Sequence, residues 1–254
     1  MIYEIYIIGF QGGIPYIDKT YRKIHLGIHN TLVSGLLHVV YTMFDTEMEI
    51  GHIKSMETKD YKLIYLKHQD LLFVALADIQ LDESKIQIML NNIATSFYDD
   101  YKDTLANWSK DLMLFQPFIR KMDSILSETI AELFFEEYPT NIVKLADYIN
   151  KNYTLEYQEL IGKALAEKIL TERFSNIVKK RNLKRELSKF TVVKNLTDDI
   201  IELSVCPFCR KKHSTKPICN FVSGFIKGML QSDVWVEKTC VGRGDASCSF
   251  SKEL

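Results

Sequence analysis

Short apolar runs dominate the start of the chain and predict a sheet. Ile2–Phe10 is rich in β-branched and aromatic residues and meets glycines at its end, and Ile14–Tyr21 alternates between apolar and polar positions, so both predict strands. The runs Glu49–Met56, Tyr61–Leu66 and Leu71–Asp78 predict three more strands. Because the last run is apolar at almost every position, we expect it at the centre of the sheet, buried on both faces.

One segment between these strands, Thr31–Phe44, has helical periodicity. We expect its apolar residues to form the helix face that packs on the sheet, and these residues are Leu32, Leu36, Val39, Val40 and Met43. Gly35 lies inside this helix, where a glycine costs ~1 kcal/mol relative to alanine. We therefore expect Gly35 to allow close packing of the helix against the sheet.

Helical patterns continue after the last of these strands. Acidic residues from Asp82 onward favour a helix start, and Pro117–Phe135 predicts a second helix. Pro139 ends the second helix, because the residue before a proline avoids helical geometry. Asn141–Tyr148 and Leu155–Val178 predict two further helices beyond this boundary.

This order of elements resembles that of a longin domain. The resemblance also includes the Gly9–Tyr16 segment, Gly-Phe-Gln-Gly-Gly-Ile-Pro-Tyr, and the Asp70–Ala77 strand, and it covers residues 1–125. It implies a five-stranded antiparallel sheet sandwiched between one helix and two others, an arrangement that profilin-like domains share in part. Gly9, Gly12 and Gly13 do not form a phosphate-binding loop, since no Gly-Lys-Ser/Thr follows them.

The last fifth of the chain predicts a smaller α+β unit. Four short strands are predicted at Phe190–Lys194, Ile200–Val205, Val234–Thr239 and Ser247–Phe250, and the last two form a hairpin through a turn. Pro217–Leu230 predicts a helix that begins with proline. Gly224 and Gly228, four residues apart in this helix, lie on one face and would let another backbone approach.

All five cysteines of the chain, at positions 206, 209, 219, 240 and 248, lie in this same region. The N-terminus lacks the basic segment of a secretion signal, so we expect a cytoplasmic protein, in which clustered cysteines indicate metal binding rather than disulfides. Thiolates suit zinc, which binds four ligands in a tetrahedron. Plain buried cysteines, a reversible disulfide and a redox-active Cys206–Cys209 pair are the alternatives.

Three segments of this region resemble the 4-vinyl reductase domain, namely Pro217–Gly228, Val236–Cys240 and Gly244–Phe250. The resemblance implies a fold of the type found in the core subunits of TRAPP tethering complexes, with long helices and a small antiparallel sheet. It maps a metal site onto Cys219, Cys240 and Cys248, with Glu237 as a candidate fourth ligand. Cys206 and Cys209 could replace Glu237 or supply most of the site, and His213 is also nearby in sequence.

The same resemblance implies that members of the family can sense small molecules. An apolar ligand pocket could be formed beside the metal by Phe221, Phe225, Met229 and Trp235, and ordinary core packing is the alternative for each residue. We divide the chain into a longin-like domain (1–125), a helical linker (126–150) and a 4-vinyl reductase-like zinc-binding domain (151–254).

The distribution of charged residues suggests a binding role for one segment only. The net charge is -1 and 26% of the residues are charged, so no overall field attracts nucleic acid. Lys179–Arg185 is a basic run, which could contact anionic lipid or an acidic partner, or could be the solvated end of the preceding helix. Membrane contact would then be peripheral at most, since no apolar run is long enough to span a bilayer.

Taken together, the two resemblances imply a protein of the membrane-traffic type, an archaeal relative of such systems. We expect a non-enzymatic adaptor, scaffold or small-GTPase regulator that forms a homodimer and contains a structural zinc ion. A sensor of small apolar molecules is the alternative function. An enzyme with catalytic zinc is the third, and it would need an open coordination position and a general base that the sequence does not indicate.

Overall fold

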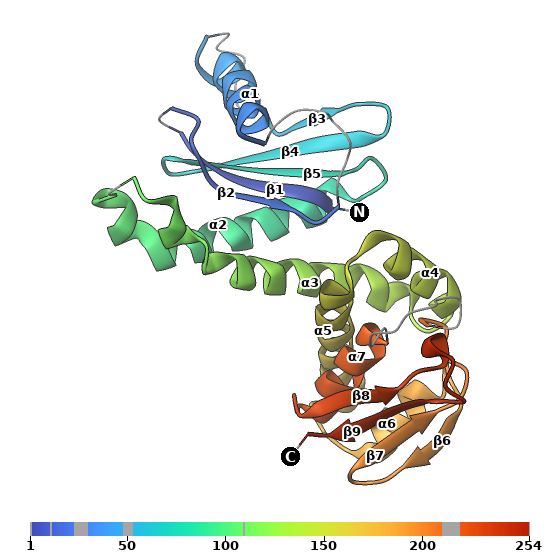
Figure 1. Ribbon diagram of the computed structural model, residues 1–254. Coiled ribbons are helices and arrows are strands. Elements are labelled where there is room, and N and C mark those ends of the chain that lie inside the picture. Colours follow the sequence, from blue (N-terminus) through green and yellow to red (C-terminus); the bar gives the residue numbers. More distant parts are fainter. Residues whose placement is uncertain are drawn as a thin grey trace. The chain divides into compact units, whose positions relative to one another are not determined.

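The computed structural model describes residues 2–10, 12–22, 30–47, 53–108, 110–209 and 219–253. These residues form two compact units, 1–125 and 126–254, and helix α3 crosses the division between them (Figure 1). Gln11, His213 and the first part of the predicted strand at 49–56 lie outside the described residues.

The first unit contains a five-stranded antiparallel sheet, as the sequence predicts, with strand order β2-β1-β5-β4-β3. The strands are β1 (Ile2–Gly9), β2 (Pro15–Thr20), β3 (Ser55–Glu57), β4 (Tyr61–His68) and β5 (Leu71–Asp78). The prediction of a central fifth strand is confirmed, because β5 pairs with β1 on one side and β4 on the other. All of its residues except Asp78 are buried.

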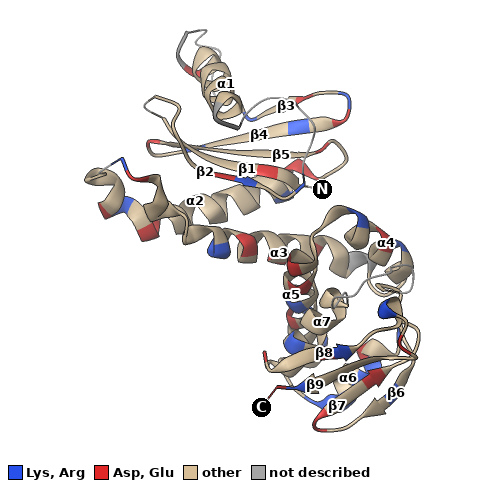
Figure 2. Ribbon diagram, viewed as in Figure 1, with Lys and Arg blue, Asp and Glu red and all other residues tan. Residues whose placement is uncertain are grey.

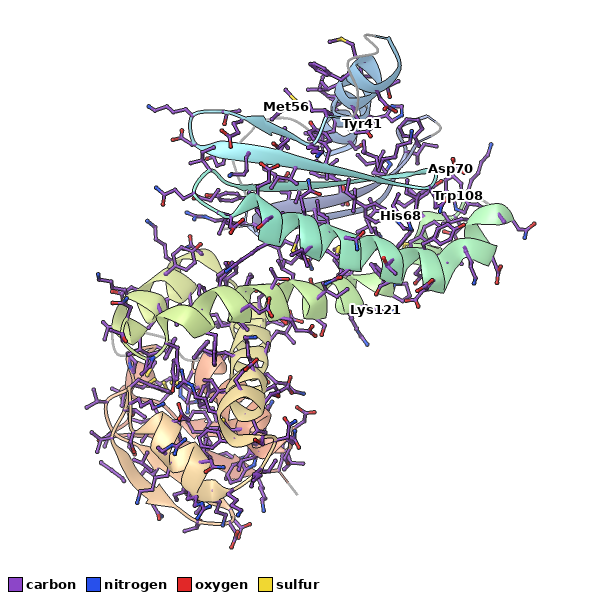
Figure 3. All side chains as sticks on the ribbon, turned by 180° about the vertical axis from the view of Figure 1, so that it is seen from behind. Tyr41, Met56, His68, Asp70, Trp108 and Lys121 are labelled. Atoms are coloured by element: carbon purple, nitrogen blue, oxygen red, sulfur yellow. The ribbon has the colours of Figure 1, made fainter. Side chains whose placement is uncertain are left out.

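Helices cover both faces of this sheet (Figure 1). The helices of this unit are α1 (Asn30–Thr42), α2 (Glu83–Ala106) and the first part of α3 (Phe118–Glu137), with short helical turns at Met43–Glu47 and Leu112–Phe115. Successive strand residues face opposite sides, so Val74 packs with Leu37 and Tyr41 of α1, whereas Phe73 meets Phe97 of α2. Tyr41 lies between α1 and the sheet (Figure 3).

The prediction of which α1 face is buried was wrong. Ser34, Leu37 and Tyr41 are buried, whereas Leu32, Leu36 and Val39 are 68%, 59% and 60% exposed. Apolar residues occur on both faces of this helix, so their spacing did not identify the face that meets the sheet. The large Tyr41 ring joins the core formed by β1, β4 and β5, and it lies on the face opposite to the predicted one. The prediction for Gly35 was also wrong, since a methyl group added there would meet no described atom within 4 Å.

The second unit combines a four-stranded antiparallel sheet with helices. The sheet order is β6-β7-β9-β8, formed by β6 (Val193–Leu196), β7 (Ile200–Leu203), β8 (Trp235–Thr239) and β9 (Cys248–Lys252). The helices that begin and end within it are α4 (Ile142–Asn152), α5 (Leu155–Phe174), α6 (Lys180–Leu187) and α7 (Asn220–Leu230), with a short turn at Val241–Arg243.

The basic run does not extend the preceding helix, which corrects one alternative for that segment. Helix α5 ends at Phe174 because Ser175 and Asn176 adopt left-handed backbone angles, with φ of 47° and 60°. The run therefore lies mainly on a separate helix, α6, whose buried face includes Leu183 and Leu187. The sequence missed this break because serine and asparagine, which tolerate the left-handed conformation, do not mark it as strongly as glycine does.

Helices α5 and α7 pack with their backbones in direct contact. A methyl group added to Gly162 would overlap the carbonyl oxygen of Phe221, and one added to Gly224 would overlap that of Glu159. One added to Gly228 would lie 2.5 Å from the carbonyl oxygen of Lys163. The prediction that the α7 glycines admit another backbone is therefore confirmed.

Among the described residues, no helix combines the length and the apolar character needed to cross a bilayer.

Replacement of Gly224 by alanine tests the backbone contact between α5 and α7. We expect Gly224→Ala to lower the free energy of unfolding of the second unit by about 3 kcal/mol, since the new methyl group must push two backbones apart. The matched control is Gly35→Ala, also in a helix but in open space, which should raise stability by ~1 kcal/mol. Urea denaturation monitored by circular dichroism measures both, and equal effects of the two substitutions would contradict the contact.

Candidate metal centre

Four separate segments of the second unit bring the five cysteines together. Cys206 and Cys209 lie in the turn that follows β7, and Cys219 directly precedes α7. Cys240 follows β8, and Cys248 is the first residue of β9. All five side chains are fully buried and all are free thiols.

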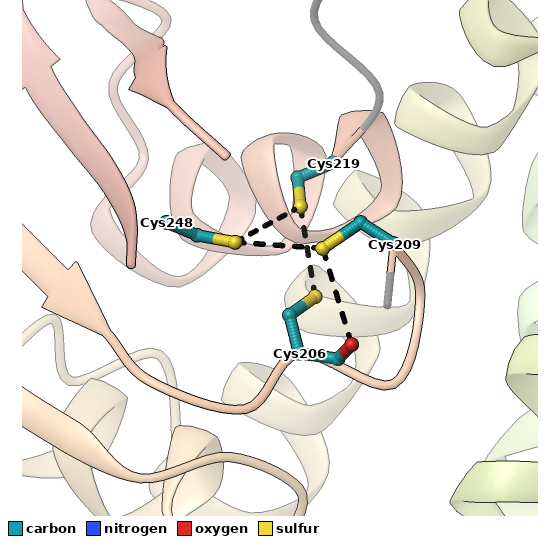
Figure 4. A group of neighbouring side chains, drawn as sticks. All are labelled: Cys206, Cys209, Cys219 and Cys248. Carbon is teal, nitrogen blue, oxygen red and sulfur yellow. Dashed lines mark hydrogen bonds between the residues drawn. The ribbon is translucent and has the colours of Figure 1, made fainter. Parts of the chain in front are cut away.

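Four of the sulfur atoms form a compact group (Figure 4). The Sγ atoms of Cys206, Cys209, Cys219 and Cys248 all lie within 4.8 Å of one another. The distance is 3.6 Å from Cys219 to both Cys206 and Cys248, and 3.4 Å from Cys209 to Cys248. In a tetrahedral site with metal–sulfur bonds of about 2.3 Å, the sulfur atoms are about 3.8 Å apart. The group is therefore close to the size that holds one metal ion.

The fifth sulfur atom lies against the same group. Cys240 Sγ is 3.4 Å from Cys219 Sγ and 3.9 Å from Cys248 Sγ. It also belongs to a second set of neighbouring donors, formed with Cys219 and the Glu237 carboxylate. The structure thus brings together all six metal-ligand residues that the sequence proposes, whereas His213 lies outside the described residues.

A β-bulge places Glu237 and Cys240 on the same side of the hairpin. In a regular strand, residues three positions apart point to opposite faces. Here Glu237 pairs with Phe250 and Thr239 pairs with Ser249, so β8 has one extra residue, Lys238, relative to β9. The extra residue shifts the alternation by one position, which allows both side chains to reach the cysteine group.

Backbone hydrogen bonds fix the orientation of the ligands. The Glu237 carboxylate accepts a hydrogen bond of 2.7 Å from the backbone N–H of Cys219, and Asp245 accepts one of the same length from Cys240. The backbone N–H of Val241 points at Cys248 Sγ, 3.4 Å away. Arg243 lies near both carboxylates, 4.0 Å from Glu237 and 3.6 Å from Asp245.

The crowding of the sulfur atoms controls their protonation. Contact with Cys206 is the main reason why the pKa of Cys219 lies far above that of an ordinary cysteine, and contact with Cys206 also raises the pKa of Cys209 to about 12. Contact with Cys206 is likewise the main cause that lowers the pKa of Cys248 to about 5. The cluster by itself therefore favours a thiolate at Cys248 and protonated sulfurs at Cys209 and Cys219, and a metal cation would be needed to displace the protons from these two thiols.

Several residues that support the centre were not singled out by the sequence. Asp245 and Arg243 were visible only as part of a turn. Asn150 of α4 donates a hydrogen bond of 2.8 Å to the carbonyl oxygen of Phe208, between the first two cysteines. No sequence signal connects Asn150 to a loop so far along the chain, since only folding brings the two together.

The proposed pocket residues Phe221, Phe225, Met229 and Trp235 are at most 2% exposed. The Phe221 ring stacks on Phe208 with a centroid distance of 4.1 Å, and Phe225 contacts Phe190 and Tyr138. None of the four residues lines either of two clefts in the described structure, one beside α1 and one beside α6.

Comparison of the sequence with known protein families and with curated proteins gives no match.

Removal of bound metal should destabilise the second unit. Because a bound metal would link four segments that no disulfide joins, its loss should remove part of the folding free energy of this unit. We expect the chain, purified without chelator, to contain a divalent metal, and treatment with a strong chelator to lower the melting temperature of the second unit by more than about 10 °C. Elemental analysis measures the metal content, and calorimetry measures the melting temperature. The melting transition of the first unit is the internal control and should not change. A metal-free chain that unfolds at the same temperature would contradict the metal centre.

Proposed function

We propose that this chain is a non-enzymatic adaptor or scaffold of the membrane-traffic type that binds and regulates a small GTPase through its first unit. In this proposal the first unit is a longin-like domain, and the second is a domain of the 4-vinyl reductase and TRAPP-core type with a structural zinc ion. The observation that carries the proposal is an uncharged, apolar helix face that is left exposed on α1.

This surface, the α1 face, consists of Leu32, Leu36 and Val39 of α1 and of Met43, the first residue of the helical turn that follows α1. The four side chains are between 45% and 68% exposed and recur every three or four residues, so they form one continuous stripe. Helix α1 carries no charged residue from Asn30 to Thr42 (Figure 2). Contiguous exposed apolar surface of this kind is typical of a site that another molecule covers.

The chemistry of α1 favours a protein as the partner. Helices that bind membrane surfaces carry lysine and arginine on their polar faces, and α1 has neither. An uncharged stripe instead fits a partner with an apolar groove or a second apolar helix, which it can contact without desolvating charge. Gly35 supports a protein partner, because it precedes Leu36, lies in open space and would let the partner's backbone approach closely.

A cleft next to α1 extends the surface available to a partner. It has a volume of about 960 Å³ and is lined by Tyr41 of α1, by Ile53 in the segment before β3, by Tyr65 of β4, and by Gln87 and Ile88 of α2. Ile88 is 62% exposed at its edge. A partner that covers the α1 face could therefore place a side chain in this cleft.

The cysteine cluster supports a structural rather than a catalytic metal. Sulfur ligands select soft or borderline ions, and zinc with four thiolates is the usual structural case, with no position open to substrate. The cluster is fully buried, and its thiols supply at least four ligands. Zinc in this position would join α7 to the β8–β9 hairpin and keep the second unit folded.

Binding assays with small GTPases from the same genome test the proposal. We expect one of them, in either its GTP-analogue or its GDP form, to bind the full chain, and Leu36→Asp to weaken this binding more than tenfold, a loss above about 1.4 kcal/mol. The control is Met113→Asp, at an exposed methionine of the same unit outside the α1 face. Isothermal calorimetry and circular dichroism measure affinity and folding.

Two outcomes would overturn this assignment. The first is the absence of binding by any of the GTPases in both nucleotide states. The second is a dimeric chain that Leu36→Asp converts to a monomer, since the α1 face would then bind a second copy of the chain rather than a GTPase.

A further inference from the structure

The cysteine cluster contains more metal ligands than one tetrahedral ion can use. Four thiolates complete a zinc site, yet five sulfur atoms and the Glu237 carboxylate gather at this point. Cys240 is fully buried, and its sulfur contacts two of the four grouped sulfur atoms. The Cys240 sulfur therefore lies against the edge of the first metal-binding tetrahedron that joins two of its sulfur atoms, and the Glu237 carboxylate is grouped with Cys219 and Cys240.

The shared edge of the sulfur tetrahedron is the line between the Sγ atoms of Cys219 and Cys248, which are 3.6 Å apart. Cys206 lies 3.6 Å from Cys219, and Cys209 lies 3.4 Å from Cys248. Cys240 contacts both ends of the edge, at 3.4 Å from Cys219 and 3.9 Å from Cys248. All of these distances are close to the edge of about 3.8 Å that a tetrahedral thiolate site requires.

We infer that the cluster binds two divalent metal ions that share the Cys219 and Cys248 sulfur atoms. The first ion is held by Cys206, Cys209, Cys219 and Cys248. The second is held by Cys219, Cys248, Cys240 and one oxygen of Glu237. Six residues thus supply four ligands to each ion, because two thiolates bridge. This inference rests on the metal centre proposed above and adds a second ion to it.

The charges near the second position fit a cation. One zinc ion with four thiolates leaves two negative charges in a buried site, next to the Glu237 carboxylate, whose side chain is 3% exposed. Arg243 forms an ion pair with this carboxylate, at 4.0 Å. A second divalent ion would add two positive charges and displace one proton from the Cys240 thiol to solvent, so the buried negative charge decreases.

The backbone also positions the second set of ligands before any ion binds. The bulge at Lys238 turns Glu237 and Cys240 to the same side, and the hydrogen bond from Cys240 N–H to Asp245 fixes the end of the strand. Thr239 donates a hydrogen bond of 2.9 Å to the carbonyl oxygen of Ser247, which ties the two arms of the hairpin together beside the bridging Cys248. Such preorganisation lowers the cost of ordering the ligands.

The alternative role for Cys240 is that of a neutral thiol that donates a hydrogen bond to a single thiolate site. The two arrangements differ in the number of ions per chain. Native mass spectrometry and elemental analysis of the full chain, with zinc supplied in excess and then removed by gel filtration, count the ions directly. We expect two zinc ions per chain for the parent protein and one for Cys240→Ser.

A second variant guards against effects of misfolding. Glu237→Gln keeps an oxygen that can accept the Cys219 N–H hydrogen bond but removes the negative charge, so we expect it to bind the second ion at least tenfold more weakly while the first ion stays bound. Glu253→Gln, at an exposed glutamate near the end of β9, is the matched control and should retain two ions. Circular dichroism verifies that each variant is folded.

Cadmium substitution provides an independent readout of the shared sulfur atoms. We expect two cadmium NMR resonances that are coupled to each other through the bridging thiolates. One ion per chain in the parent protein, unchanged in Cys240→Ser, would overturn the two-ion inference and leave the structural zinc proposal intact. A second ion that persists in Cys240→Ser would overturn it as well, and a chain that binds no metal would overturn both proposals.

Discussion

The second unit depends on the contact between the start of α7 and the β8–β9 hairpin, which is made by cysteine sulfur atoms. Cys219 at the start of α7 lies 3.4 Å from Cys240 and 3.6 Å from Cys248, and the Glu237 carboxylate binds the backbone of Cys219. In our proposal a metal replaces thiol protons and converts these contacts into bonds, so that folding and metal binding become coupled.

Close packing of two helix backbones makes this arrangement possible. Gly162, Gly224 and Gly228 let α7 lie directly against α5, so that α7 occupies the space beneath the sheet without a layer of side chains between the helices. The stacked rings of Phe208 and Phe221 fill the region between the cysteine turn and α7. The cysteine cluster therefore holds the start of α7 and the glycine contact holds its side against α5, so a change at either should affect the other.

The first unit has the opposite character, since its described core consists of apolar side chains and its unusual feature is exposed. The sheet is covered on both faces, and β5 is buried through most of its length. Even so, α1 has an apolar stripe on its outer side, and it carries no charged residue that would favour exposure to water. In our proposal, the buried cysteine cluster of the second unit maintains structure, and the exposed apolar face of α1 in the first unit binds a partner protein.

The sequence by itself determined the five-stranded sheet, the central place of β5 and the gathering of the cysteines, because these follow from local alternation and from the chemistry of thiols. It did not determine which face of α1 is buried, because leucines and valines on the outer face resemble core residues when only spacing is read. It also did not decide the ligand set, since Cys206 and Cys248 are distant in sequence and their separation depends on how β7, α7 and the hairpin pack. Only the tertiary structure shows that Cys219 belongs to two sets of neighbouring metal-ligand donors, because a distance between sulfur atoms is a property of the fold and not of the residue order.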